Sequence, residues 1–238
     1  AKDFIPEALA SECAVGNIVW SVVFAYNQNT IGATKAASIE DFFDTAKIPG
    51  KRAMRKRPQV NMEWALLADG VAADQLYPLD VPRALRKIDE LKPHVLSFWG
   101  SGAESQQLMI EGEASMGAIW HTRATLLHED SEGRIQWGFD HAFLNASSWG
   151  VLKDNPAGAA PAMQFIQHAL QPAGQLKLFE ALGNGPSNAA TQQLMSAEQR
   201  EINCASEANM KKQIFLNTQW YADHYSSTLE QYLTHLSK

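Results

Sequence analysis

Cysteine, positive charge and long apolar runs are all scarce in this sequence, and each scarcity excludes a class of protein. Among 238 residues there are two cysteines, Cys13 and Cys204, neither in a CxxC pair nor near histidines at ligand spacing, so no metal site is expected. The formal net charge of −6 argues against general binding to nucleic-acid phosphates. No apolar run is long enough to cross a membrane. On these grounds the two cysteines are either buried thiols or a disulfide.

Sequence motifs for common enzyme chemistry are also missing. The sequence contains no GxxxxGK[ST], GxGxxG, HExxH or GxSxG pattern. The glycine-rich GNGPSN follows a predicted helix rather than opening one, so it is interpreted as a turn. We therefore expect a protein that is not an enzyme and has no cofactor.

Strand-like and helix-like segments alternate along the chain, which predicts an α/β fold. The β-branched and aromatic residues of 17–27 are typical of a buried strand. Residues 80–95 predict an amphipathic helix, with Pro82 at its start and Pro93 at its end. The basic KRAMRKRP segment is interpreted mainly as a solvated strand edge or loop, with an anion or partner patch as the alternative.

Six ordered segments together resemble one known family. They are VGNIVWSVVFAYN, SIEDFFDTAKIPGKRAM, ALLADGV, LMIEGEASMGAIWHTR, SSWGVLKDNPAGAAPAMQFIQHALQPAGQ and LGNGPSNAA. In this order they resemble the extracytoplasmic solute-binding proteins of ABC importers, in the spermidine/putrescine-binding group.

The resemblance implies a periplasmic-binding-protein type II fold, in which two α/β lobes joined by crossover strands hold a solute between them. It assigns residues 1–26 to the end of lobe 1 and the first crossover strand, and 27–138 to a complete lobe 2. Residues 139–238 become the return crossover and the C-terminal part of lobe 1. The first lobe is therefore expected to be incomplete, as in a truncated or incompletely recorded chain.

The resemblance also implies the partners and the location. These are a small-molecule solute and the membrane permease of an ABC importer, without nucleic acid or direct membrane insertion, for a protein that is monomeric when full length and periplasmic. The start AKDFIPEALASECAVG is not a signal peptide. An oxidising compartment supports a Cys13–Cys204 disulfide. The alternatives are an enzyme on the same fold and the ligand-sensing domain of a transcriptional regulator.

Trp120 is the first candidate for the ligand site. It ends a predicted strand, and ligands of open α/β sheets lie beyond the carboxyl ends of the strands. The resemblance assigns it the role of an aromatic wall, and the alternative is a core tryptophan. Glu63 lies where the polyamine binders place carboxylates, although a helix N-terminus also favours glutamate without any ligand.

The nature of the solute depends on three neutral residues. Asn145 and Ser147 stand where the polyamine binders carry charged and aromatic groups, and Asn184 replaces an aromatic residue. Neutral polar groups suit hydroxyls, amides or a carboxylate better than a diamine. We therefore expect a small polar solute, amino-acid-like or a modified amine, in preference to a polyamine.

Four further residues complete the predicted site. Tyr26 and Trp99 are candidates for the cleft, and Ser101 either presents a hydroxyl to an anionic group or caps the helix that follows. Tyr221 matches a family site residue, with packing as the preferred alternative.

Overall fold

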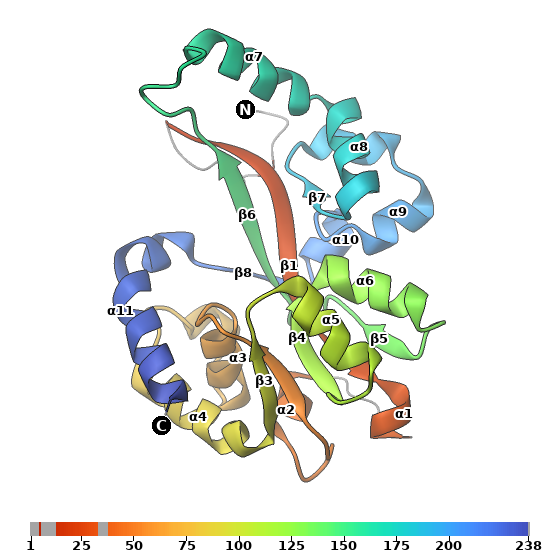
Figure 1. Cartoon of the computed structure of the whole chain (residues 1–238), viewed down its shortest axis with the longest axis vertical. Coiled ribbons are helices and arrows are strands. Elements are labelled where there is room, and N and C mark those ends of the chain that lie inside the picture. The colour runs from red at the N-terminus through yellow and green to blue at the C-terminus, as the bar shows by residue number, and fades with distance from the viewer. Residues whose placement is uncertain (1–4, 6–12, 33–37, 238) are drawn as a thin grey trace. The chain divides into compact units, whose positions relative to one another are not determined.

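The computed structural model describes residues 5, 13–32 and 38–237, and the chain divides into two compact units. Unit 1 comprises Ala1–Ser21 with Leu144–Phe215, and unit 2 comprises Val22–Phe143 with Leu216–Lys238. The chain therefore enters unit 2 twice, once along its first strand and again at its C-terminal helix (Figure 1).

The strands are β1 Val15–Asn27, β2 Arg52–Arg55, β3 Val95–Trp99, β4 Met116–Trp120, β5 Ile135–Trp137, β6 Phe143–Trp149, β7 Gly185–Pro186 and β8 Ile214–Phe215. The α-helices are α1 Gln28–Ile31, α2 Ile39–Phe43, α3 Asn61–Ala68, α4 Val81–Leu91, α5 Gly102–Ile110, α6 His121–Asp130, α7 Ala159–Ala169, α8 Pro172–Leu182, α9 Ala197–Ile202, α10 Glu207–Met210 and α11 Thr218–Leu236. The short 3-10 helices are η2 Ala73–Gln75, η3 Lys92–His94 and η4 Ala189–Leu194. Within the described ranges no helix has both the length and the apolar character to cross a bilayer.

The sheet of unit 2 places three strand ends together. Strand β2 runs parallel to β3 on one side and to β4 on the other, and β1 pairs antiparallel with both β4 and β5. Parallel strands end at the same edge of a sheet, so the carboxyl ends of β2, β3 and β4 meet there. The predicted α/β class is confirmed, and the strand predicted over 17–27 is found within β1.

Unit 1 is organised around the first half of β1. Strands β6 and β7 both pair with β1, and β8 pairs with β6. In the antiparallel pairing with β7, Ile18 lies opposite Pro186. Figure 1 shows β1 and β6 side by side.

Helix α4 is the amphipathic helix that the sequence predicts, and its start is set by a side-chain cap. The Asp80 carboxylate accepts a hydrogen bond from the backbone N–H of Arg83 at 3.0 Å, and Pro82 occupies the first turn, where no N–H donor is needed. The residues of its buried face are Val81, Ala84, Leu85, Ile88 and Leu91. This face packs against α3. Each Å² of apolar surface that it removes from water stabilises the fold by roughly 25 cal/mol.

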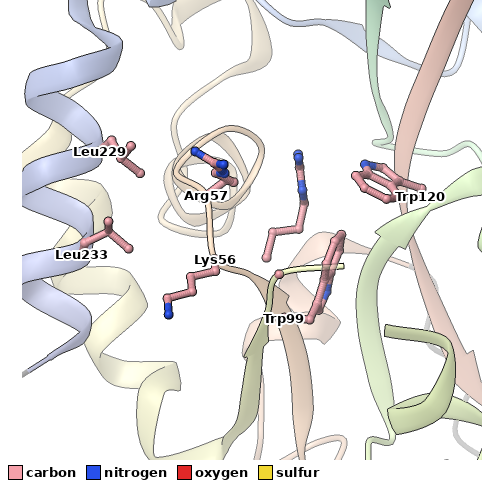
Figure 2. Close-up of a pocket in the computed structure, with 8 residues that line it drawn as sticks. Lys56, Arg57, Trp99, Trp120, Leu229 and Leu233 are labelled. Atoms are coloured by element: carbon pink, nitrogen blue, oxygen red, sulfur yellow. The ribbon is translucent and has the colours of Figure 1, made fainter. Parts of the chain in front are cut away.

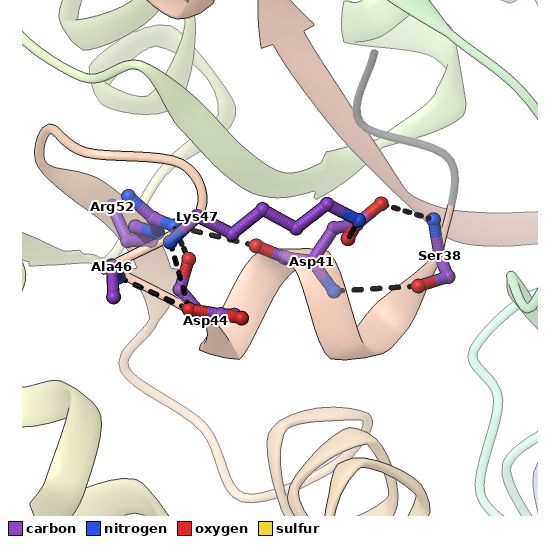
Figure 3. Close-up of polar contacts among 6 residues, drawn as sticks. All are labelled: Ser38, Asp41, Asp44, Ala46, Lys47 and Arg52. Atoms are coloured by element: carbon purple, nitrogen blue, oxygen red, sulfur yellow. Dashed lines mark hydrogen bonds and ion pairs between the residues drawn. The ribbon is translucent and has the colours of Figure 1, made fainter. Parts of the chain in front are cut away.

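Arg52 joins β2 to α2. Helix α2 begins with a capping box in which Ser38 and Asp41 each accept from the other's backbone N–H (Figure 3). Arg52 is fully buried and donates to the carbonyls of Phe42 at 2.9 Å and Gly50 at 2.7 Å. Burial lowers the pKa of its guanidinium to about 10. The interpretation of this basic segment as a solvated edge is wrong for Arg52 and also for Arg55, which is 8% exposed.

The predicted Cys13–Cys204 disulfide is absent from the structure. Cys204 is fully buried in unit 1 and its thiol contacts the carbonyl of Val19 at 3.6 Å, whereas Cys13 is exposed beside Gly150. Val19 lies four residues into β1, about 13 Å from the strand's start at the usual rise per residue. Two Cα atoms must come within roughly 7 Å for a disulfide, and the extended strand keeps the two thiols apart.

The structure groups α11 differently from the sequence-based division, which assigned 139–238 to the return crossover and the C-terminal part of lobe 1. Contacts place Leu216–Lys238 in unit 2 instead. The Tyr221 hydroxyl donates to Glu63 at 2.8 Å, and the Tyr232 hydroxyl donates to the carbonyl of Arg55 at 2.9 Å. These buried bonds hold α11 within unit 2.

Candidate functional site

A cavity of about 430 Å³ lies in unit 2 where the parallel strands end (Figure 2). Three of its lining residues, Arg55, Trp99 and Trp120, are the last residues of β2, β3 and β4. The others are Lys56, Arg57, Gly100, Leu229 and Leu233. This edge is where open α/β sheets bind their ligands.

The Arg55 guanidinium lies against both tryptophans. Its central carbon is 5.6 Å from the centre of the Trp99 ring and 5.7 Å from that of Trp120. The two rings meet edge to face at 5.3 Å between centroids. Burial lowers the pKa of Arg55 to about 10, so the group keeps its charge at neutral pH.

The two tryptophans are held differently. Trp99 is 2% exposed, and its indole N–H donates to the carbonyl of Ala118 at 3.0 Å. Trp120 is half-buried and immediately precedes α6. A Cβ atom at Gly102 would lie 3.1 Å from the Trp120 ring, so the start of α5 packs closely against this ring. Trp99 is thus fixed by a hydrogen bond and Trp120 by close packing.

The charge of Arg55 determines which end of a solute suits the cavity. An ammonium on an aromatic face gains roughly 0.5 to 2 kcal/mol. An ammonium on either ring would also be repelled by the nearby Arg55 guanidinium, because like charges repel. The cavity therefore favours an anionic group, which a guanidinium binds through two parallel hydrogen bonds when the group is a carboxylate.

Glu63 and Tyr221 bond to each other in the structure. Glu63 is fully buried; one carboxylate oxygen accepts from the backbone N–H of Val60 at 2.7 Å, and the other accepts from the hydroxyls of Tyr77 at 2.7 Å and Tyr221 at 2.8 Å. Burial raises the pKa of the Glu63 carboxyl, and these hydrogen bonds oppose the rise. The Glu63 carboxyl thus joins α3 to α11 through its hydrogen bond with Tyr221.

Tyr26 and Ser101 lie elsewhere in unit 2. Tyr26 is half-buried in β1, opposite Met116 of β4. The Ser101 hydroxyl accepts from the backbone N–H of Glu104 at 3.2 Å, as the N-cap of α5. The capping alternative considered for Ser101 is therefore the geometry found.

Asn145, Ser147 and Asn184 all belong to unit 1. The Ser147 hydroxyl accepts from the indole N–H of Trp20 at 3.1 Å. The Asn145 side chain accepts from the backbone N–H of the next residue at 2.8 Å, and Asn184 is half-buried just before β7. Of the predicted site residues, the structure thus brings Trp99 and Trp120 together around one cavity.

Arg55 is the residue that sequence reasoning missed. Its neighbours Arg52, Lys56 and Arg57 give the segment a high local charge, which is usually a sign of a solvated surface. The available signal was its position at the end of a short strand with the apolar pair Ala53 and Met54 before it. A cation at the carboxyl end of a buried strand points to the ligand edge rather than to solvent.

An α/β unit with a cationic and aromatic cavity at the carboxyl edge of its parallel strands is of the kind that binds small solutes. The chain belongs to the bacterial extracellular solute-binding protein family, whose profile matches residues 3–203.

Three relatives illustrate the family. A γ-aminobutyric acid-binding protein of Pseudomonas aeruginosa is 34% identical over 96% of this chain. An ABC transporter substrate-binding protein from Bradyrhizobium japonicum USDA 110 has 33% identity and a TM-score of 0.89, covering 98% of this chain and 73% of that protein. The PBP MotA from A. tumefaciens B6, solved in complex with glucopine, has 28% identity and a TM-score of 0.89, covering 99% of this chain and 74% of that protein.

These relatives confirm the predicted periplasmic-binding-protein fold. The chain spans 64% of the length of the Pseudomonas protein. Neither solute named for these relatives is a polyamine, so the polyamine label of the resembled group finds no support.

Proposed function

We propose that this protein is the solute-binding component of a periplasmic ABC importer and captures an amino-acid-like solute through its carboxylate. The observation that carries the proposal is the buried Arg55 guanidinium packed against Trp99 and Trp120, at the carboxyl edge of the unit 2 sheet. The solute is delivered to a membrane permease, and no chemical step is required.

Arg55 holds the carboxylate, and the tryptophan rings flank it. The solute named for the Pseudomonas relative, γ-aminobutyrate, carries one carboxylate and one amine on a short methylene chain. The binding roles expected for Asn145, Ser147 and Asn184, which belong to unit 1, stay a prediction.

Titration calorimetry with γ-aminobutyrate, its primary amide and putrescine tests the proposal. We expect the acid to bind and the amide to bind about 10- to 100-fold more weakly, because a hydrogen bond to a charged group is worth roughly 1.5 to 3 kcal/mol. Putrescine should not bind measurably. Arg55→Gln should cause a similar loss for the acid, whereas Arg86→Gln, the same change at an exposed position on α4, should cause none. Equal binding of acid and amide by the unaltered protein would defeat the carboxylate assignment.

A further inference from the structure

Helix α11 presents three tyrosines toward the segment that carries Arg55. Tyr221, Tyr225 and Tyr232 are spaced by four and seven residues, so they fall within about 40° of one another around the helix. Tyr221 donates to Glu63 of α3. Tyr225 accepts from Arg57, two residues after β2, at 2.7 Å. All three hydroxyls of this tyrosine stripe therefore bond to residues 55–63.

Tyr232 holds the backbone of Arg55 directly. It is fully buried, and its hydroxyl donates to the Arg55 carbonyl at 2.9 Å. The side-chain N–H₂ of Asn61 donates to the same carbonyl at 2.7 Å and to the Tyr232 hydroxyl at 2.6 Å. The three groups form a closed set of hydrogen bonds around one carbonyl oxygen.

The hydrogen bonds to the Arg55 carbonyl lie where β2 has a neighbouring strand on one side. The pairing of β2 with β4 covers Arg52 and Ala53, whereas the pairing with β3 continues to Arg55. Beyond Ala53 the hydrogen bond from Tyr232 of α11 to the Arg55 carbonyl takes the place of a second neighbouring strand. This bond is called the tether. A guanidinium that must meet a carboxylate needs its backbone fixed, because binding geometry is lost within fractions of an ångström.

Helix α11 also contributes side chains to the cavity itself. Leu229 and Leu233 line it together with Arg55, and Figure 2 shows both projecting from α11 toward the cavity. Leu233 is 36% exposed. The helix thus supplies an apolar wall as well as a tether.

We propose that α11 is part of the ligand site, with Tyr232 as the positioning residue that fixes Arg55 for the solute's carboxylate and with Leu229 and Leu233 as the facing apolar wall. This inference rests on the proposed function, since it assigns Arg55 the carboxylate.

The test compares hydroxyl deletions on the same helix. Tyr232→Phe keeps the ring that packs edge to face on Phe98 and removes the hydroxyl that bonds to the Arg55 carbonyl and to Asn61. We expect it to weaken binding of γ-aminobutyrate about tenfold and to reduce the preference for the acid over its primary amide. Tyr221→Phe also removes a buried hydroxyl of α11, so it should lower stability while leaving that preference unchanged.

A second variant keeps the test decisive if Tyr232→Phe folds poorly. Leu233→Glu, at a partly exposed position, places a competing carboxylate on the cavity wall and should weaken γ-aminobutyrate binding at least tenfold relative to Leu233→Gln. Equal affinities of these two variants would overturn the inference, as would an unchanged acid preference in folded Tyr232→Phe. If either result is accompanied by strong loss of binding in Arg55→Gln, the proposed function stands and only the role of α11 is rejected. Unchanged binding in Arg55→Gln would reject the carboxylate assignment itself.

Discussion

Strand β2 begins and ends with arginines that have different tasks. Arg52 donates its hydrogen bonds to backbone carbonyls around α2, whereas Arg55 lies against two indole rings at the strand's end. Arg52 is therefore a structural residue, whereas Arg55 is a cation that lines the cavity.

Trp120→Ala tests the aromatic wall. Removing the ring takes away a cation–π contact with Arg55 worth roughly 0.5 to 2 kcal/mol, so solute affinity should fall about 2- to 30-fold. Titration calorimetry measures the loss. Trp149→Ala removes another half-buried tryptophan, in unit 1 beside Phe165, and should leave affinity unchanged. Unaltered affinity in Trp120→Ala would remove this residue from the site.

Glu63 makes stability depend on pH. Its pKa is raised in the folded protein by burial, so above the unfolded value near 4.5 the folded state holds the proton longer than the unfolded state does. Stability from this group is complete at lower pH and is lost as pH rises through the folded pKa, by up to about 1.4 kcal/mol per pH unit. Urea unfolding across this range should show the advantage of the unaltered protein over Glu63→Gln shrinking as pH rises.

The matched control for that series is Glu40→Gln, at an exposed position in the first turn of α2. Its stability should differ from that of the unaltered protein by no more than about 0.5 kcal/mol, as is usual for surface substitutions. A difference for Glu63→Gln that is constant across the pH range would show that this carboxyl titrates normally.

The sequence predicted Trp99 and Trp120 as neighbours of a ligand because strand ends are recognisable from local patterns. It did not predict that Glu63 would meet Tyr221, because these residues are 158 positions apart and local periodicity carries no information on such pairs. It missed Arg55 for a different reason, since charge alone does not distinguish a buried cation from a solvated one.

At the scale of elements, α4 and β1 were predictable from caps, periodicity and β-branched composition. The pairing of the two-residue strand β7 with β1 was not, because its geometry depends on tight packing rather than on propensity. A Cβ atom at Gly185 would lie 2.7 Å from Val19 and 2.8 Å from the Cys204 sulfur.

Gly185→Ala should therefore destabilise the protein. Overpacking of a buried site costs typically 1 to 3 kcal/mol, and we expect a loss of about that size in urea unfolding. Gly100→Ala provides the comparison, because a Cβ there meets nothing within 4 Å. Equal stabilities of the two variants would show that β7 has room to move.

At the scale of the whole molecule, the predicted disulfide is replaced by a buried thiol. Burial raises the pKa of Cys204 to about 12, and a thiol of that kind is nearly unreactive at neutral pH because the thiolate is the reactive form. The family resemblance suggested a bridge from the compartment alone. The structure decides against it, because Cys204 contacts Val19 within β1 whereas Cys13 precedes that strand.

Reductant should therefore leave the melting temperature unchanged, as measured by calorimetry with and without dithiothreitol. Cys204 should resist alkylation in the native protein and react after denaturation, which peptide mapping by mass spectrometry can follow. A lower melting temperature on reduction would show that the protein contains a disulfide after all.

Unit 2 is assembled from two stretches of chain, with all of the 144–215 segment made between them. A ribosome therefore completes β2, β3 and β4 long before it makes the helix whose Tyr232 holds Arg55. Until that helix emerges, the nascent chain has the strands of the cavity without their tether. Competence to capture solute should thus arise only after α11 has been made, so a nascent chain that still lacks this helix should not hold solute in the cavity.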